Sequence, residues 1–154
     1  MRTKTHEPES SGEARAAILS YHDELRGLLT ETMHRAEGAA ESAADAEPLR
    51  AQARELYEAF EEHIGFEARI LPAALRDVIG WGDVLQAELV EGHARQRAVL
   101  ASARLALEPE GLSPVRLAES VRRFAEHMIE DLRAEERSLL TADLDALTTD
   151  GHGG

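Results

Sequence analysis

The sequence predicts an all-α protein, an antiparallel up-down bundle of four helices, and three observations favour this fold. The chain has 154 residues, which suits a single domain, and 43% of them are hydrophobic, enough for one core. Only 4% are aromatic, whereas Ala and Leu are abundant, a composition typical of helices and not of β-sandwiches. Four long segments carry apolar residues three and four positions apart, and short turn signals separate them.

The first two helices are expected over about residues 12–38 and 48–75. The core-facing stripe of the first helix is Ile18, His22, Leu25, Leu29 and Met33. Residues 38–47 are expected to form a loop, although their alanines could extend a helix. Pro48 suits a first helical turn, where its missing N–H costs nothing, and Pro72 is expected to kink or end the second helix. The stripe of that helix is Leu56, Phe60, His63, Glu67 and Ile70 or Leu71.

The third helix is expected to start after the turn at 80–83, with Asp83 as its N-cap, and to stop before Pro109. Its stripe is Leu85, Leu89, His93, Gln96, Leu100 and Leu107. The fourth helix has Ser113 as its N-cap and Pro114 at its first position. Its stripe is Leu117, Val121, Phe124, Met128, Asp131, Glu135 and Leu139. Residues 13–147 are therefore expected to form one four-helix domain, with flexible ends at 1–12 and 148–154.

The charge balance and the absence of cysteine exclude several classes of function. Lys and Arg total 17 against 30 Asp and Glu, a formal net charge of −13, so we expect neither a nucleic-acid partner nor an anionic membrane surface. No segment has the apolar length of a signal peptide or a membrane span, and the cytoplasm is the expected location. Without cysteine, thiolate catalysis, disulfides and iron–sulfur clusters are excluded, and the chemistry must use His and carboxylates.

Each predicted helix places a titratable side chain where a core residue is expected. These six residues are His22, His63, Glu67, His93, Asp131 and Glu135. A single core histidine is usually just hydrogen-bonded, but buried charges are costly unless they are paired or bound to metal. Residues equally far from a turn lie level in an up-down bundle. The midpoints between successive members of the set His22, His63, His93 and Asp131 fall at 42–43, at Val78 and at Leu112. All three midpoints lie in or beside predicted turns, so these side chains can meet in one layer, with Glu67 and Glu135 one helical turn further along. Imidazole and carboxylate together suit a first-row divalent metal, and carboxylates can bridge two ions.

Two registers compete on the fourth helix. His127 with Asp131 is one pair, and Asp131 with Glu135 is the other. Phe124 and Met128 lie seven and three positions before Asp131, the same apolar spacing that precedes the histidine of the second helix. We therefore prefer Asp131 and Glu135 and keep His127 as a flanking candidate.

Two neighbouring features are given no functional role. The acidic residues Glu61, Glu62, Glu130 and Glu136 are interpreted as parts of solvated outer faces. Tyr21 adjoins His22, but successive helical residues point about 100° apart, so a redox role for the phenol is not expected.

The set of polar segments resembles the hemerythrin-like family, the HHE cation-binding domain, over nearly the whole chain. The segments that carry the resemblance are Tyr21-His22-Asp23-Glu24-Leu25, His63-Ile64-Gly65-Phe66-Glu67 and Glu91-Gly92-His93-Ala94. The resemblance implies a four-helix bundle with a non-heme iron site, usually of two irons with an oxo or hydroxo bridge, that meets dioxygen or related small molecules. The fourth helix departs from the family's HxxxE pattern if Asp131 and Glu135 are the pair. Three histidines with three carboxylates favour oxygen activation over reversible oxygen carriage.

The function expected from the sequence is a metal-binding protein, with iron as the cofactor and a small diatomic molecule or peroxide as the ligand. It would bind or sense dioxygen, nitric oxide or peroxide, or handle iron, and committed enzymatic turnover is not expected. A ferritin-like di-iron oxidase is disfavoured, because Glu does not stand three residues before any candidate histidine. A metal-free helical interaction module, in which the polar side chains specify the register of the bundle, is the other alternative.

Overall fold

The computed structural model describes residues 10–42, 46–76, 78, 80, 82–108 and 112–138. These residues form four helices and no strand, as the sequence predicts. The helices are α1 (Ser11–Ser42), α2 (Glu47–Arg76), α3 (Gly82–Leu107) and α4 (Pro114–Ser138). Of the two ends expected to be flexible, 1–12 and 148–154, residues 1–9 and 148–154 lie outside the described residues, whereas Ser11 and Gly12 belong to α1.

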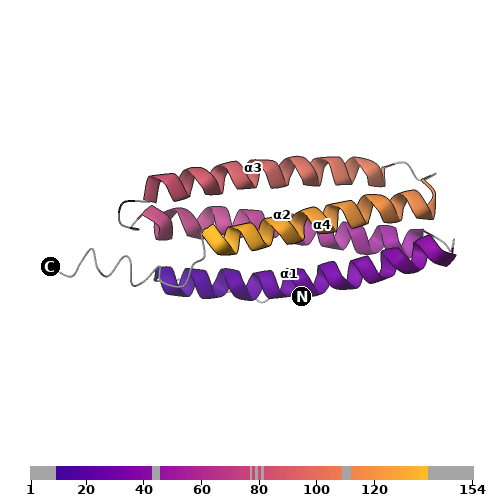
Figure 1. Ribbon diagram of the computed structural model, residues 1–154, viewed down its shortest axis with the longest axis horizontal. Helices are drawn as coiled ribbons and strands as arrows, with labels where there is room; N and C mark the ends of the chain where they lie inside the picture. The colour runs from indigo at the N-terminus through magenta and orange to yellow at the C-terminus, as the bar shows by residue number, and fades with distance from the viewer. Residues whose placement is uncertain are drawn as a thin grey trace.

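The four helices lie side by side along the long axis of the molecule (Figure 1). Helices α1 and α3 each pack against both α2 and α4. The beginning of α2 lies beside the end of α3, where the buried Arg50 guanidinium donates a hydrogen bond of 2.7 Å to the carbonyl oxygen of Leu107. Among the described helices, none combines the length and the apolar character needed to cross a membrane.

Helix α1 is longer than expected, and α2 ends within one residue of its expected end. Helix α1 continues to Ser42, because the alanine-rich residues after Gly38 extend the helix instead of forming a loop. Helix α2 does not end at Pro72 and runs to Arg76. Pro72 removes one backbone hydrogen bond, but Leu71 and Leu75 on either side of it are fully buried, and this burial stabilises the last turn.

Serine side chains cap the first turns of two helices. The Ser113 hydroxyl accepts a hydrogen bond of 3.2 Å from the backbone N–H of Arg116, which confirms the predicted N-cap of α4. The Ser10 hydroxyl accepts a hydrogen bond of 3.0 Å from the N–H of Glu13 at the start of α1.

A close backbone approach joins α2 to α3. Gly80 has a positive φ of 74°, which glycine adopts without strain. A Cβ atom added at Gly82 would lie 2.8 Å from the carbonyl oxygens of both Leu75 and Arg76. Only glycine therefore allows the first residue of α3 to contact the last turn of α2 so closely.

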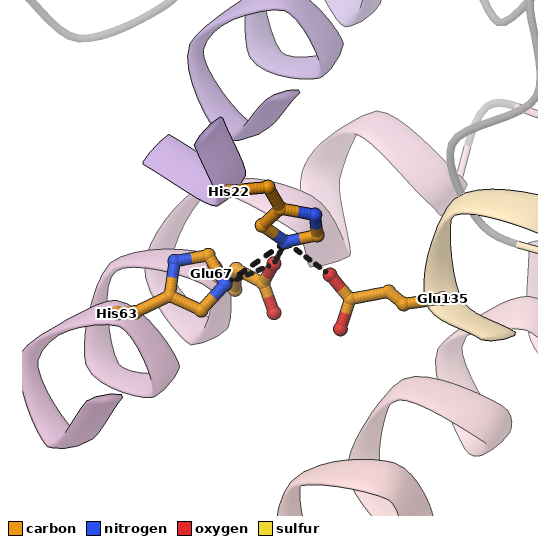
Figure 2. Close-up of side chains that lie close together, drawn as sticks. All are labelled: His22, His63, Glu67 and Glu135. Carbon is orange, nitrogen blue, oxygen red and sulfur yellow. Dashed lines mark hydrogen bonds and ion pairs between the residues drawn. The ribbon is translucent and has the colours of Figure 1, made fainter. Parts of the chain in front are cut away.

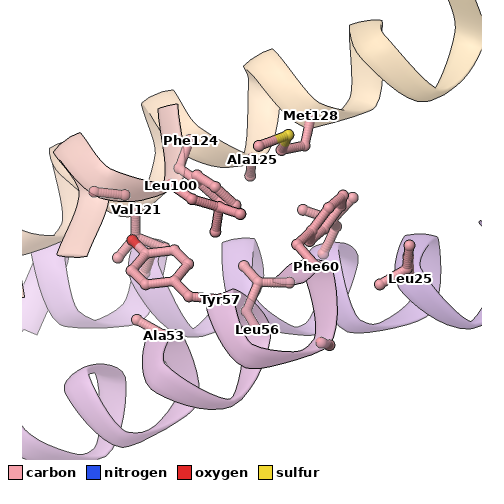
Figure 3. Close-up of a cluster of buried hydrophobic side chains, with 14 of the residues drawn as sticks. Leu25, Ala53, Leu56, Tyr57, Phe60, Leu100, Val121, Phe124, Ala125 and Met128 are labelled. Carbon is pink, nitrogen blue, oxygen red and sulfur yellow. The ribbon is translucent and has the colours of Figure 1, made fainter. Parts of the chain in front are cut away.

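The interior contains two apolar clusters of unequal size. The large core cluster centres on three aromatic rings, with ring centroids 4.5 Å apart for Tyr57 and Phe124 and 5.6 Å apart for Phe60 and Phe124 (Figure 3). It extends through buried aliphatic residues such as Leu25 and Met128. The small core cluster consists of Ala14, Ile18, Ile70, Leu71, Ala74, Leu75, Val78 and Leu89. The buried histidines and glutamates lie between the two clusters.

Candidate metal centre

The polar layer occupies one level of the helices, with apolar core above and below it. On each of the first three helices, a residue of the small core cluster lies on one side of this level and a residue of the large core cluster on the other. The flanking pairs are Ile18 and Leu25 around His22, Ile70 and Ile64 around Glu67, and Leu89 and Leu100 around His93. The charged and hydrogen-bonding groups are therefore enclosed along the helix axes by residues that exclude water.

Four side chains from three helices form the centre of this layer, and we call them the ligand cluster. They are His22 of α1, His63 and Glu67 of α2, and Glu135 of α4 (Figure 2). Each offers one ligand atom, and these atoms all lie within 4.8 Å of one another. All four residues are buried, with exposed fractions between 0% and 8%.

The Glu67 carboxylate uses both of its oxygens to contact three imidazoles. Its Oε2 lies 2.8 Å from His63 Nε2 and 3.1 Å from His22 Nε2. Its Oε1 accepts a hydrogen bond of 2.9 Å from the Nε2 of His93, which brings α3 to the same point. A carboxylate whose two oxygens face different groups of nitrogen ligands has the geometry of a bridge between two ions.

The imidazole of His22 lies between α2 and α4. Its Nε2 is 3.1 Å from His63 Nε2 on one side and 3.0 Å from Glu135 Oε1 on the other (Figure 2). Only one of the two facing Nε2 atoms can carry the proton that lies between them. The lone pair of the other nitrogen points into the same small space as the carboxylate oxygens.

A second carboxylate orients His22 from outside the ligand cluster. The Nδ1 of His22 donates a hydrogen bond of 2.7 Å to Glu136 Oε2, and Arg26 donates one of 2.8 Å to Glu136 Oε1. The interpretation of Glu136 as part of a solvated outer face is therefore wrong. Its position, one residue after Glu135, lies at the contact between α1 and α4. One sequence feature could have indicated a carboxylate here: Arg26 follows His22 by one helical turn and supplies a cation for it.

The rings around His63 include a contact that the sequence did not predict. The ring centroid of Tyr21 lies 4.7 Å from that of His63 and 5.4 Å from that of Phe66. Tyr21 therefore covers the His63 imidazole edge-on. The direction of Tyr21 relative to His22 does not indicate this contact, because His63 belongs to the neighbouring helix α2.

Burial and neighbouring charges shift the protonation of the ligand cluster in opposite directions. Burial alone would lower the pKa of His22, but Glu135 and Glu67 outweigh it and raise this pKa to about 10. Burial raises the pKa of Glu135 well above its ordinary value, and the neighbouring Glu67 carboxylate raises it further. Burial would also raise the pKa of Glu67, but hydrogen bonds with Glu135 and the histidines hold it well below its usual range. Without metal, the cluster therefore keeps protons at His22 and Glu135.

Asp131, a predicted ligand, lies beside the ligand cluster and not in it. It is half-buried and lines a pocket of about 150 Å³ between α3 and α4, together with Glu135 and Gln96. Gln96 was recognised only as part of a stripe, yet it is 4% exposed and its Oε1 has no hydrogen-bond partner among the described residues. Helical periodicity predicts that Gln96 faces inward, but it does not show whether the amide is packed among core residues or lines a pocket.

His127, the flanking candidate, is exposed and lines a separate groove with Phe124 and Val99. The structure thus brings together His22, His63, Glu67 and Glu135, adds His93 through Glu67, and leaves Asp131 and His127 outside.

The donor set fits a first-row divalent metal, because imidazole nitrogens and carboxylate oxygens are the ligands these ions take. Glu136 also supplies the outer hydrogen bond to a ligand imidazole that is common at metal sites in proteins. Comparisons of the chain with known protein families, curated proteins and solved structures found no match. The side chains themselves must therefore carry the functional assignment.

Proposed function

We propose that the chain is a non-heme iron protein that holds two ions in the interior of an antiparallel, hemerythrin-like four-helix bundle. It would bind or sense dioxygen, nitric oxide or peroxide, or handle iron, without committed turnover. The observation that carries this proposal is the ligand cluster, in which four buried side chains offer ligand atoms within 4.8 Å of one another.

The unsatisfied polar atoms of the ligand cluster favour a metal over a purely structural network. Glu135 Oε1 has only the ion-pair contact of 3.0 Å with His22 Nε2, and His63 Nδ1 is buried without a hydrogen-bond partner among the described residues. A buried polar network that only specifies register is expected to satisfy all its members, since each unsatisfied group costs about 1–3 kcal/mol. A cation at the centre of the cluster would satisfy the facing imidazole and carboxylate lone pairs together.

The placement of Glu67 and Asp131 supports two ions instead of one. Glu67 directs Oε2 toward His22 and His63 and Oε1 toward His93, so one carboxylate serves two groups of nitrogen donors. Asp131 precedes Glu135 by one helical turn and faces the pocket on the α3 side, where a second ion would need an oxygen ligand.

The residues around the site would each have a defined task. Bound iron would supply the redox chemistry and the open coordination position for the small ligand. Glu136 would keep the proton of His22 on Nδ1 and leave Nε2 free as a ligand atom. Tyr21 and Phe66 would cover the His63 side of the site and limit the access of water.

Metal analysis of the protein, purified from iron-supplemented cells, tests the proposal directly. We expect about two irons per chain in the parent protein. His63→Ala and Glu67→Ala should each lose half or more of the metal, while Glu61→Ala, at an exposed position on the same helix, should keep it. A parent protein that binds no metal would instead favour the metal-free interaction module.

A second set of variants tests the fourth-helix ligands. Glu135→Ala should lower the metal content, because Glu135 is the member of the ligand cluster that α4 supplies. Asp131→Ala should lower it as well, and His127→Ala should largely spare it, since His127 is exposed. An essential His127 together with a dispensable Glu135 would contradict the proposed ligand set.

A further inference from the structure

The two apolar clusters close the polar layer along the helix axes, but its side between α3 and α4 is open. A pocket of about 150 Å³ lies there, and we call it the α3–α4 pocket. Residues of α3 and α4 line it, among them Gly92 and Gln96 of α3 and Ala134 and Glu135 of α4. The groove lined by His127 and the pocket lined by Tyr57 contain no member of the ligand cluster.

Two buried polar side chains connect the α3–α4 pocket to the interior. Glu135 lines the pocket and also belongs to the ligand cluster, with its Oε1 3.0 Å from His22 Nε2. Gln96 lines the same pocket, is 4% exposed, and has an Oε1 without a hydrogen-bond partner among the described residues. A buried amide oxygen without a partner is costly and is a suitable oxygen ligand for a hard cation or its water shell.

The charge of the α3–α4 pocket is negative even with Glu135 protonated. Three further carboxylates line it, those of Glu88, Glu91 and Asp131, and Arg95 is the one cation among the lining residues. Arg95 lies 3.6 Å from Glu91, so its charge is already opposed by one of these three. A cleft lined by one sign of charge raises the local concentration of the opposite ion and the rate at which that ion binds.

We propose that the α3–α4 pocket binds a partly hydrated divalent cation and is the route by which metal reaches the ligand cluster. This inference rests on the proposed function and adds to it the entry route of the metal and the positive charge of the ion that enters. The volume corresponds to roughly five waters, enough for an ion that has kept part of its hydration shell. The outer carboxylates Glu88 and Glu91 would attract the ion, Gln96 and Asp131 would replace some of its waters, and Glu135 would pass it to the imidazoles.

Gly92 allows the pocket to be filled without disturbing the fold. A Cβ atom added there would meet only the Arg95 guanidinium, at an ordinary 3.8 Å. Gly92→Leu should therefore fold, and because leucine favours helix it should also stabilise α3. Gly38→Leu is the matched control, since a Cβ at Gly38 meets nothing within 4 Å and Gly38 lines none of the pockets described above.

Stopped-flow absorbance of Co²⁺ uptake by the metal-free full chain tests the route. We expect Gly92→Leu to bind the same final amount of Co²⁺ as the parent but roughly ten-fold more slowly or worse, and Gly38→Leu to match the parent rate. Ala134→Leu, on the opposite wall of the pocket, should repeat the slowing independently. Uptake by both Gly92→Leu and Ala134→Leu at the parent rate would overturn the inference.

Removing the charges of Glu88 and Glu91 tests the electrostatic attraction of cations to the pocket separately from the volume of the pocket. The double variant Glu88→Gln and Glu91→Gln should slow uptake several-fold at low salt and lose most of this difference at high salt, because salt screens exposed charges. Glu24→Gln, exposed on α1, should leave the rate unchanged. A Co²⁺ uptake rate in the double variant equal to that of the parent would contradict electrostatic attraction by Glu88 and Glu91.

The final amount of bound metal and the rate of uptake separate the two proposals. A parent protein that binds neither iron nor Co²⁺ would overturn the proposed function and this inference together. A parent that binds both ions, with unaltered rates in the variants that fill the pocket, would overturn the inference alone.

Discussion

His22 is the side chain in which the inner and outer parts of the site meet. Its Nε2 faces Glu67, His63 and Glu135, while its Nδ1 donates to Glu136. Burial alone would raise the pKa of Glu136, but hydrogen bonds from Arg26 and His22 hold it below the ordinary value. The carboxylate therefore stays ionised, and a negative charge on the far side of the ring makes the imidazole a stronger ligand.

The outer carboxylate should matter for metal affinity although it is not a ligand. We expect Glu136→Ala to weaken metal binding by roughly ten- to a hundred-fold. Glu136→Gln should have a smaller effect, because the amide oxygen still accepts the His22 hydrogen bond without its charge. Competition with a chelator of known affinity measures both, with the exposed Glu126→Gln as the control. Unchanged affinity in Glu136→Ala would contradict an orienting role.

The protonation of His22 should make the stability of the metal-free protein depend on pH. The folded-state pKa of His22, about 10, lies above its ordinary 6.5, so the folded chain keeps a proton that the unfolded chain loses between these values. This stabilisation is complete below pH 6.5 and is lost as the pH rises toward 10. The raised pKa of Glu135 acts in the same direction.

Urea denaturation of the metal-free protein at pH 6, 8 and 9 measures this dependence. We expect the free energy of unfolding to fall steadily over this range in the parent and in His34→Gln, an exposed control. His22→Gln should show a much flatter profile. A parent whose stability rises with pH over this range would contradict the assignment.

The residues that face inward could be predicted from the sequence, whereas the contacts of residues at the flanks of the helices could not. Helical periodicity and the positions of the turns suffice to place His22, His63, Glu67 and Glu135 at one level. They do not show which neighbouring helix a flanking residue contacts, because that depends on how each helix is rotated against the next. Glu136 and Tyr21 lie at such flanks. The outer-face expectation for Glu136 was wrong, and the contact of Tyr21 with His63 was not predicted.

The ends of the helices show which local signals are strong. The Ser113 cap followed from a side chain that satisfies a free backbone N–H, and the structure contains that hydrogen bond. Pro72 was expected to kink or end the second helix, and residues 38–47 were expected to form a loop. In the structure α2 continues to Arg76 and α1 to Ser42. Apolar burial at Leu71 and Leu75 outweighs the lost hydrogen bond at Pro72, and that burial comes from tertiary packing.

The cap of α4 gives a prediction at the scale of the helix. Ser113→Ala should lower the free energy of unfolding by about 1 kcal/mol, because the Arg116 N–H loses its partner. Ser113→Asp should retain most of the stability, since aspartate caps equally well. Thermal or urea unfolding measures the difference, with Ser102→Ala, exposed within α3, expected to be neutral or slightly stabilising. Equal losses at both serines would rule out a specific cap.

At the scale of the whole molecule, a polar layer separates two apolar clusters. The layer buries carboxylates and imidazoles at a cost in desolvation, and the clusters on either side supply the apolar burial that offsets it. Metal should therefore contribute to folding as well as to function, because it binds the assembled layer and not the unfolded chain.

Metal at about 1,000 times its dissociation constant should stabilise the fold by about 4 kcal/mol. The shift should appear in the parent and in Glu61→Ala as a higher melting temperature on adding metal. Glu67→Ala should melt at the same temperature with and without metal, because the carboxylate that contacts three histidines is absent. A metal-dependent shift of parental size in Glu67→Ala would place the binding elsewhere.

The contact at Gly82 sets the axial position of α3 and therefore the composition of the polar layer. The first residue of α3 lies against the last carbonyls of α2, and His93 follows about three turns later, where its Nε2 reaches Glu67 at 2.9 Å. A larger residue at 82 would push α3 along its axis, and each residue of a helix advances by only about 1.5 Å. A displacement of that size would remove the His93 hydrogen bond while leaving the other three helices in place. The glycine at the start of α3, eleven residues before His93, thus determines whether the site includes a third histidine.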